Sequence, residues 1–500
     1  MPSERVRIEL KPLGETLEAG RGVPLRDLLF AHGVEFPCGG RGRCKRCRVR
    51  LLEGSLTVTD ADRRLLAPAE LAAGWRLACH ARAEGPLTLE IGQMQAPILG
   101  DDSPFEFQPR AGLGVAVDLG TTTLVVQLLD LSRARVLAVR AALNPQAAHG
   151  ADLMSRVQYG LAPEGARTLR EGIRQRIGAL IAEVVAAAGV PPEAIGGIAI
   201  VGNAVMHHLF CGIDVEPLSR APFEPLWNGL ERFSAAELGW TAVPRAGVAF
   251  LPCLGGFVGS DALAGLLAVR MGASAPLVGL IDLGTNAEIL LGDRQRIVCA
   301  SAAAGPAFEG GRISTGMRAA TGAISEVSLI DGRLRCRVLG DVPPRGICGS
   351  GLVDAAAAAL DLGLLGASGR LADGVLELCP PVRLTQADIR ELQLAKGAVA
   401  AGVRILLKRL GASAGDVQRV YLAGAFGNYV NLESARRIGL IAFPEDKVTQ
   451  AGNTALLGAK LALFADDLAY DDLRRRVEHI SLASDPGFQE IYAEQMRFPE

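Results

Sequence analysis

The stretch Leu113-Gly-Val-Ala-Val-Asp-Leu-Gly-Thr-Thr-Thr123 decides how most of this chain folds. An apolar run leads into Asp118, Gly120 allows a tight turn, and a second apolar run, Leu124–Leu129, returns as an antiparallel strand. In such a turn, backbone N–H groups and threonine hydroxyls can cradle phosphate oxygens, while the aspartate holds Mg²⁺ through water. The stretch therefore predicts a phosphate-binding hairpin.

A second copy of this pattern begins 164 positions later, at Asp282. An apolar run again precedes the aspartate, and Gly284 again starts the turn before a returning strand, Glu288–Leu291. One such hairpin is a weak signal, because a purely structural turn also explains it. Two of them in a long chain of strands and helices indicate a duplicated α/β fold.

A third element lies where a duplicated fold needs a nucleoside site. The run Arg419–Gly427 reads as a strand that ends in Gly424 and Gly427. Glycines at these positions let the main chain lie flat against a nucleotide. The run Ile198–Asn203 makes an analogous step from strand to loop in the first half. The sequence therefore predicts an ATP site between two related halves.

Four cysteines near the start of the chain point to a metal cluster: Cys38, Cys44, Cys47 and Cys79. A [2Fe–2S] cluster needs four thiolates, with backbone N–H groups near its sulfides. The glycines Gly39, Gly40 and Gly42 let the main chain wrap closely enough to supply them. The C-x5-C-x2-C spacing is one residue longer than in plant-type ferredoxins and resembles that of the adrenodoxin-like branch. Tetrahedral zinc is the alternative, although zinc ribbons usually carry paired cysteine knuckles.

The segments around the cysteines fit a β-grasp ferredoxin. Val6–Leu10 alternates like a half-buried strand, Val23–Ala31 has helical spacing with a proline near its start, and Leu87–Ile91 reads as a closing strand. The proline-rich stretch after it reads as a semi-extended linker. The expected domains are a ferredoxin-like domain (1–95), a linker (96–112) and an ATPase (113–500) with a first half (113–275), a second half (276–418) and a segment carrying the nucleoside strand and C-terminal helices (419–500).

Composition restricts the class of protein further. The 500 residues include 49% hydrophobic and 21% charged side chains, and the net charge is −2. These values suit a soluble globular protein of several domains and give no general reason to expect nucleic acid as a partner. Residues 1–20 lack the apolar core of a secretory signal, and no long uncharged apolar run follows. We therefore expect a cytoplasmic protein whose cysteines bind metal or stay reduced.

The hairpins and the nucleoside strand resemble the actin, sugar kinase and Hsp70 superfamily over about residues 113–465. Further motifs narrow the resemblance: Asn144-Pro-Gln146, Gly150-Ala-Asp152 with Arg156, Gly202–His208, Gly305–Gly311, Gly349–Gly351 and Gly452–Gly458. With the N-terminal cysteines, the whole set is similar to the ATP-dependent reductive activators of corrinoid proteins. Larger relatives carry an extra domain where this linker passes directly into the first phosphate strand, so partner docking does not carry over.

The resemblance implies an α/β and α+β multidomain fold, in which a β-grasp [2Fe–2S] ferredoxin precedes a duplicated ribonuclease H-like ATPase. It implies ATP-dependent reductive reactivation, in which one electron from the cluster returns Co(II) to Co(I). The implied cofactors are the [2Fe–2S] cluster, ATP and Mg²⁺. The implied partners are a corrinoid (cobalamin-binding) protein or methyltransferase and a low-potential electron donor; a homodimer is allowed, and neither nucleic acid nor a membrane is expected.

Residue roles follow from the matched motifs. The catalytic candidates are Asp118, Asp282 and Glu288, with Ser301 as a cobalt contact. The adjacent histidines, His207 and His208, are expected to pack rather than to catalyse. The residues expected to bind the nucleotide and its phosphates are Gly120, Thr121, Thr122, Thr123, Gly202, Asn203, Gly284, Thr285, Asn286, Gly305, Glu309, Gly310, Gly349, Ser350, Gly424, Ala425 and Gly427.

Three other functions compete with this interpretation. A small-molecule kinase uses the same ATP fold, and an ATPase with an iron–sulfur sensing module is a related alternative, but a kinase has little use for a fused cluster. A chaperone-like module needs a peptide-binding domain after the ATPase, yet only about 35 residues follow position 465. A plain electron carrier would work without ATP.

Overall fold

The computed structural model describes residues 5–11, 15–29, 32, 34, 42, 47–91, 107–149, 153–317, 319, 322–465 and 467–500. The predicted ligands Cys38 and Cys44 lie outside the described residues, as do Gly39, Gly40, the segment 150–152 and most of the predicted linker.

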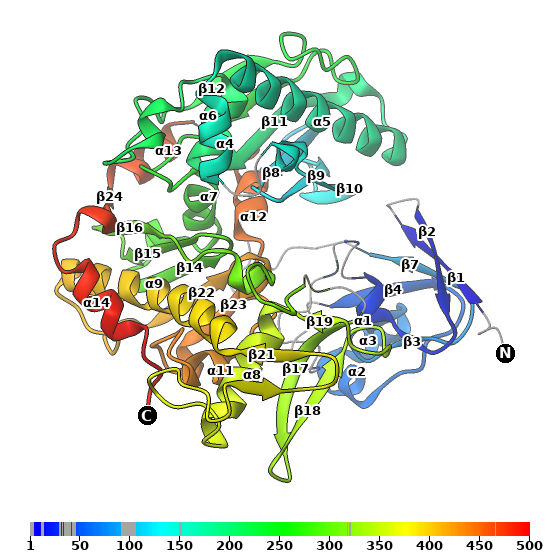
Figure 1. Ribbon diagram of the computed structural model, residues 1–500. Coiled ribbons are helices and arrows are strands. Elements are labelled where there is room, and N and C mark those ends of the chain that lie inside the picture. Colours follow the sequence, from blue (N-terminus) through cyan, green and yellow to red (C-terminus); the bar gives the residue numbers. More distant parts are fainter. Residues whose placement is uncertain are drawn as a thin grey trace.

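The N-terminal domain is built on a five-stranded mixed sheet in the order β2-β1-β7-β4-β5 (Figure 1). The helix expected to start at Val23 starts at Leu25, because Val23 and Pro24 pair with Ala83 and Arg82 instead. The first strand alternates exposed and buried side chains, as predicted, and its apolar residues join the domain core. The elements are β1 (Arg5–Lys11), β2 (Glu15–Gly20), β3 (Val23–Pro24), α1 (Leu25–Leu29), β4 (Arg48–Glu53), α2 (Asp60–Leu65), α3 (Pro68–Ala72), β5 (Trp75–Leu77), β6 (Arg82–Ala83) and β7 (Leu87–Glu90).

The rest of the chain contains two six-stranded sheets with related topology. Five strands of the first sheet run in the order β10-β9-β8-β11-β13, and five of the second run in the equivalent order β16-β15-β14-β22-β23. In each, an antiparallel meander is continued by two parallel strands. The fold is therefore duplicated, as the two hairpins predict. The strands are β8 (Leu113–Leu119), β9 (Thr123–Asp130), β10 (Arg135–Leu143), β11 (Ile195–Gly202), β12 (Glu231–Ser234), β13 (Gly247–Phe250), β14 (Val278–Leu283), β15 (Ala287–Gly292), β16 (Ile297–Ala302), β22 (Arg419–Ala423), β23 (Val448–Gly452) and β24 (Val477–His479).

Helices cover these sheets, and two small sheets extend the second half. The central parallel strands are buried on both faces, as their apolar runs require. The helices are α4 (Leu153–Gly160), α5 (Pro163–Ala188), α6 (Ala204–Cys211), α7 (Ser260–Ala268), α8 (Gly349–Asp361), α9 (Gln386–Leu410), α10 (Gly424–Gly427), α11 (Leu432–Arg437), α12 (Thr454–Ala462), α13 (Asp467–Arg475) and α14 (Phe488–Gln495). The small sheets contain β17 (Ala323–Ile330), β18 (Arg333–Val338) and β19 (Gly346–Ile347), and β20 (Val375–Glu377) with β21 (Arg383–Thr385).

Helices α7 and α12 lie between the two large sheets (Figure 1). Their backbones touch where Gly458 faces Ala264: a Cβ added at Gly458 would lie 2.1 Å from the Ala264 carbonyl oxygen. Only a residue without a side chain allows this approach. The two halves of the duplicated fold are thus joined by two closely crossed helices.

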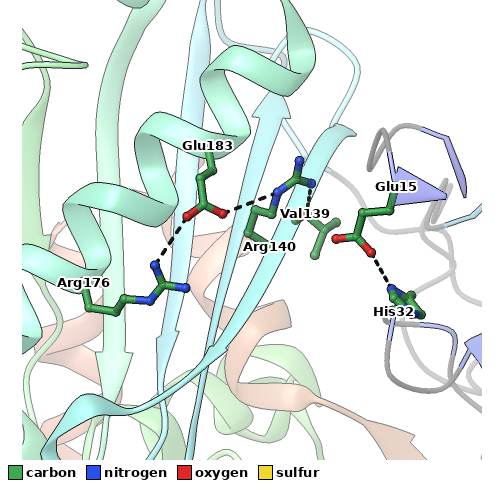
Figure 2. A network of polar contacts seen from close by, with 6 residues as sticks. All are labelled: Glu15, His32, Val139, Arg140, Arg176 and Glu183. Carbon is green, nitrogen blue, oxygen red and sulfur yellow. Dashed lines mark hydrogen bonds and ion pairs between the residues drawn. The ribbon is translucent and has the colours of Figure 1, made fainter. Parts of the chain in front are cut away.

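The N-terminal domain contacts both halves of the duplicated fold. Val139 of β10 and Tyr429, which follows α10, both pack against the ferredoxin core. In Figure 2, Val139 lies between two polar contacts. On one side, Arg140 Nε lies 3.6 Å from Glu183 Oε2; on the other, His32 Nδ1 lies 2.6 Å from Glu15 Oε2. Among the helices that the structure describes, none has the length and apolar character needed to span a membrane.

Candidate nucleotide and cluster sites

The first predicted phosphate loop is a tight hairpin between β8 and β9, closed by a 3.1 Å hydrogen bond from Gly120 N to the Thr123 carbonyl. Two asparagines brace it from outside. The amide of Asn144 donates to the Gly120 carbonyl (3.0 Å), and its backbone N–H donates to the carbonyl of Thr122 (2.8 Å). The amide of Asn203 donates to Thr121 Oγ1 at 2.9 Å. The loop is therefore held in shape before any ligand binds.

The second predicted phosphate loop lies against the predicted nucleoside turn. Gly424 has a φ of +83°, which favours glycine, and a Cβ there would lie 2.4 Å from Asp282 Oδ1 and 2.6 Å from the Leu283 carbonyl oxygen. Gly284 N donates to the Asn286 carbonyl at 2.9 Å, and Thr285 Oγ1 donates to Glu309 Oε1 at 2.5 Å. Two of the three predicted motifs are thus in direct contact.

One hydrogen bond links the two halves at this site. The amide of Asn453, at the start of α12, donates to Asp118 Oδ2 at 2.7 Å. Asn453 also caps its helix, because its side-chain oxygen accepts from Leu456 N at 2.8 Å. The same side chain therefore fixes the helix start and the carboxylate of the first loop.

Four carboxyl groups converge on the site: Asp118, Asp261, Asp282 and Glu288. Burial raises the pKa of Asp118 to about 6, against the opposing hydrogen bond from Asn453. Burial, with the negative charge of Asp118, raises the pKa of Asp282 to about 7. Burial first, and the neighbouring carboxylates second, also raise the pKa of Asp261 and Glu288. A cation near these groups would relieve their repulsion, although no three acidic, histidine or cysteine side chains of the described residues are close enough together to bind a metal ion directly.

A polar row crosses the second sheet from this cluster. Asp282 pairs with Glu288 across β14 and β15, and Glu288 pairs with Ser301 across β15 and β16. Paired residues on neighbouring strands present their side chains on the same face, and Ser301 Oγ donates to Glu288 Oε1 at 3.2 Å. The candidate cobalt contact is therefore connected to the phosphate site by one carboxyl group.

Four further predicted nucleotide residues lie around a short turn and at the start of α8. Gly305 and Gly310 bracket the short turn that carries Glu309, and both have positive φ. Gly349 begins α8 and backs onto the Phe308 carbonyl, where a Cβ would lie 1.9 Å from the oxygen. The hydroxyl of Ser350 donates instead to the carbonyl of Ser325, at 2.8 Å.

The described part of the cluster site suits a [2Fe–2S] group. Cys47 is buried and Cys79 half-buried, and their segments are joined by a 2.9 Å hydrogen bond from Ala78 N to the Cys47 carbonyl. Gly42 has a φ of +62°, and a Cβ there would lie 2.5 Å from His80 Nε2, beside Cys79. Gly42 thus approaches the Cys79 segment as closely as glycine allows. Cys47 and Cys79 can supply two of the four thiolates that a [2Fe–2S] cluster needs.

Comparisons with known proteins agree with this geometry. Residues 8–84 match the 2Fe-2S iron-sulfur cluster binding domain, 113–274 match the RACo middle region, and 277–500 match the C-terminal domain of RACo, the ASKHA domain. The corrinoid activation enzyme RamQ of Eubacterium limosum is 34% identical over 76% of this chain and 69% of its own length.

The chain belongs to the RACo family.

Two further matches support the assignment. The [Co(II) methylated amine-specific corrinoid protein] reductase of Methanosarcina barkeri is 28% identical over 76% of each chain. The solved structure of a reductive activator for corrinoid, iron-sulfur protein matches with a TM-score of 0.70 and 27% identity, covering 99% of this chain and 98% of that one. The predicted family and fold, a ferredoxin followed by an actin-like ATPase, are thereby confirmed.

Within this RACo family member, three residues of the site received no role from the sequence, although the motifs Asn144–Gln146 and Gly452–Gly458 contain two of them. Asn144 and Asn453 brace Asp118 and its loop, and Asp261 contributes a fourth carboxyl group from the first turn of α7. The available signals were a Gly-Asn pair before each helix start, at Asn203 and Asn453, and the glycine-rich run Gly255–Gly259 that leads into Asp261. The expectation for His207 and His208 is consistent with the structure: both are fully buried and each contacts a backbone carbonyl.

Proposed function

We propose that this chain reduces the Co(II) of a corrinoid protein to Co(I), using one electron from a [2Fe–2S] cluster and the free energy of Mg-ATP hydrolysis. The names of two relatives, a corrinoid activation enzyme and a Co(II) corrinoid protein reductase, support the proposal. The observation that carries it is the convergence of both phosphate hairpins with Gly424 on one site, in a chain that also has a cluster-binding domain.

Each element of the nucleotide site has a proposed role. Asp118 and Asp282 would hold Mg²⁺ through water, and the hairpin residues with Gly202, Asn203 and Glu309 would cradle the phosphates. The turn at Gly424, Ala425 and Gly427 would flank the nucleoside. Asp282, Glu288 and Asp261 are the candidates for orienting the attacking water, since all three are carboxyl groups in the same cluster.

Cys38, Cys44, Cys47 and Cys79 are the proposed cluster ligands, and the cluster would supply the one-electron chemistry. Plant-type centres have potentials of about −400 mV, and a deficit of about 59 mV in a one-electron step corresponds to about 1.4 kcal/mol. A deficit of about a few hundred millivolts is several kcal/mol, which differential binding of nucleotide states can provide. This requirement explains why a redox domain and an ATPase share one chain.

The proposal also includes the electron donor, the location in the cell and the domain boundaries. An external low-potential donor would return an electron to the cluster after each transfer. The protein would act in the cytoplasm, and neither nucleic acid nor a membrane would take part. The chain would work as domains 1–95 and 113–500 joined by 96–112, with 113–275 and 276–418 as the halves and 419–500 carrying the nucleoside turn. A homodimer is compatible with this arrangement.

The decisive experiment follows the absorbance change from Co(II) to Co(I) in a purified corrinoid protein, with and without ATP. Wild type should reduce cobalt only with ATP and a low-potential donor, and Cys79→Ser should lose the activity together with its visible iron–sulfur absorbance. An ATP-independent signal, or full activity without Cys79, would contradict the proposal.

Ser301 is proposed to face the corrinoid, because it ends the polar row that starts at the phosphate site. Ser301→Ala should change the cobalt spectrum of the complex with the corrinoid protein and slow activation, while ATP binding stays intact. If the spectrum and the activation rate both stay at wild-type values, Ser301 has no role at cobalt.

A further inference from the structure

Helix α2 of the ferredoxin domain contacts the segment that carries Cys79. Asp62 of this helix is completely buried, and its Oδ1 accepts a 2.7 Å hydrogen bond from Leu77 N, two residues before Cys79. Its Oδ2 accepts from the backbone N–H and the hydroxyl of Thr59, both at 2.8 Å. The start of the helix and the approach to Cys79 are therefore fixed by one carboxylate.

The same helix also contacts the loop that carries the other ligands. Arg64, in the last turn of α2, donates from Nη2 to the carbonyl of Gly42 at 2.9 Å. Gly42 lies between Cys38 and Cys44 in the sequence, and a Cβ at Gly42 would lie 3.0 Å from the Cβ of Ala61 on α2. One short helix thus contacts both Gly42, which lies between two proposed ligands in the sequence, and the segment that leads to Cys79.

This contact places a permanent positive charge at the ligand loop. A guanidinium does not lose its proton in proteins, and its N–H group here is directed at the main chain between two proposed ligands. Reduction adds one negative charge to a [2Fe–2S] cluster, so a nearby cation stabilises the reduced form more than the oxidised form. The orientation of the loop also sets the N–H donors that reach the sulfides, and such donors influence cluster potentials.

We infer that Arg64 is a positioning residue for the [2Fe–2S] cluster, which holds the ligand loop through Gly42 and raises the midpoint potential of the bound cluster. The inference rests on the cluster assignment within the proposed function, and on neither ATP coupling nor the corrinoid partner. It gives α2 a second role besides packing, because Arg64 links the helix to the ligand loop while Asp62 links it to the domain core.

The test measures the midpoint potential of the full-length protein with its cluster, by redox titration followed through visible absorbance and EPR. Arg64→Gln keeps a hydrogen-bond donor but removes the charge. The matched control is Arg63→Gln, which removes the same charge from the neighbouring position of α2; both side chains are exposed, and the hydrogen bond to Gly42 comes from Arg64. At the wild-type midpoint potential, the ratio of reduced to oxidised cluster should fall at least threefold in Arg64→Gln and stay near one in Arg63→Gln. Iron and sulfide content should match wild type in both variants.

Equal potentials in Arg64→Gln and Arg63→Gln, with full clusters, would overturn the inference. If Arg64→Gln does not retain its iron, the titration is carried out on Arg64→Lys instead, because lysine keeps the charge without the planar geometry of the guanidinium. A changed EPR signal or potential in Arg64→Lys supports the positioning role, and wild-type values for both overturn it. The titration needs neither nucleotide nor corrinoid protein, so its outcome is independent of the cobalt assay.

Discussion

The side-chain amide of Asn453 donates a 2.7 Å hydrogen bond to Asp118 Oδ2, although 335 positions separate the two residues. Asp118 ends the first strand of the first half, and Asn453 precedes the last helix between the halves. The bond also lowers the pKa of a carboxyl group that burial raises to about 6. Asn453 therefore keeps Asp118 available as an anion while it connects the two halves.

Replacing Asn453 should weaken Mg-nucleotide binding. In Asn453→Ser the hydroxyl keeps the helix cap but is too short to reach Asp118, so the carboxyl group loses its donor and its pKa rises. We expect about a tenfold loss of affinity for Mg-ATP, equivalent to about 1.4 kcal/mol, measured by nucleotide titration and by the ATPase rate near neutral pH. Asn431→Ala removes a helix cap without touching the site; it should lower stability only. Equal affinities in both variants would show that the Asp118 contact is irrelevant to binding.

Asp282→Asn should abolish ATP hydrolysis and stabilise the unliganded protein. Burial and Asp118 raise the pKa of Asp282 from 3.8 to about 7, so folding favours its protonated form and the charged form costs stability at any pH above the unfolded value. A neutral amide removes this cost. We expect a gain of about 1 kcal/mol at pH 8, because the half-buried group is partly screened, measured by urea unfolding. Mg-ATP should then no longer stabilise the variant, and a loss of stability would contradict the argument.

Two helical glycines should respond oppositely to alanine. Gly172 of α5 has open space around its Cβ position, so Gly172→Ala should stabilise the protein by about 0.5–1 kcal/mol through helix propensity. Gly458 of α12 meets the backbone of Ala264, so Gly458→Ala must push α7 and α12 apart and should cost about 1–3 kcal/mol. Denaturant unfolding of both variants checks this, and Gly458→Ala should also slow ATP hydrolysis, because the helices join the two halves. A stabilised Gly458→Ala would contradict the described crossing.

Acid should destabilise the first half through His207. Burial, and secondly the neighbouring His208, lower the pKa of His207 to about 3, while the unfolded chain protonates it near 6.5. Between these values the unfolded chain binds more protons, so stability falls as the pH drops below about 6.5. This group should cost about 2 kcal/mol between pH 7.5 and 5. His207→Gln should show a flatter dependence of melting temperature on pH, with a remainder from His208, whose pKa burial also lowers.

Much of the fold could be predicted, because the decisive elements are local. The alternation of β1, the apolar strands before Asp118 and Asp282, and the hairpin glycines all act within a few residues. The start of α1 could not be predicted, because Val23 and Pro24 pair with β6, about 60 positions away. Such pairing is tertiary and leaves no periodicity in the sequence.

The candidate site, like the fold, could be predicted only in part. The residues of the hairpin turns carry a recognisable pattern, and the bracing residue Asn203 was predicted with them, but the bracing roles of Asn144 and Asn453 could not be predicted. Asn144 and Asp261 reach the hairpins only after the chain has folded, and the contact of Asn453 with Asp118 also needs the two halves to assemble. Helix-capping asparagines are common, so Asn453 carried no signal of its second hydrogen bond. The clustering of the carboxyl groups also arises only in the fold, because Asp261 and Asp118 are 143 positions apart in the sequence.

Tyr429 gives the molecule a second mechanical connection. Its side chain packs against the ferredoxin core, while its neighbour Asn428 donates to the Gly424 carbonyl at 2.8 Å and accepts from Gly452 N at 2.7 Å. The turn that meets Asp282 and the surface that supports the redox domain are therefore one rigid piece of backbone. We therefore expect that a nucleotide which shifts this turn would also displace the ferredoxin domain through the contact of Tyr429.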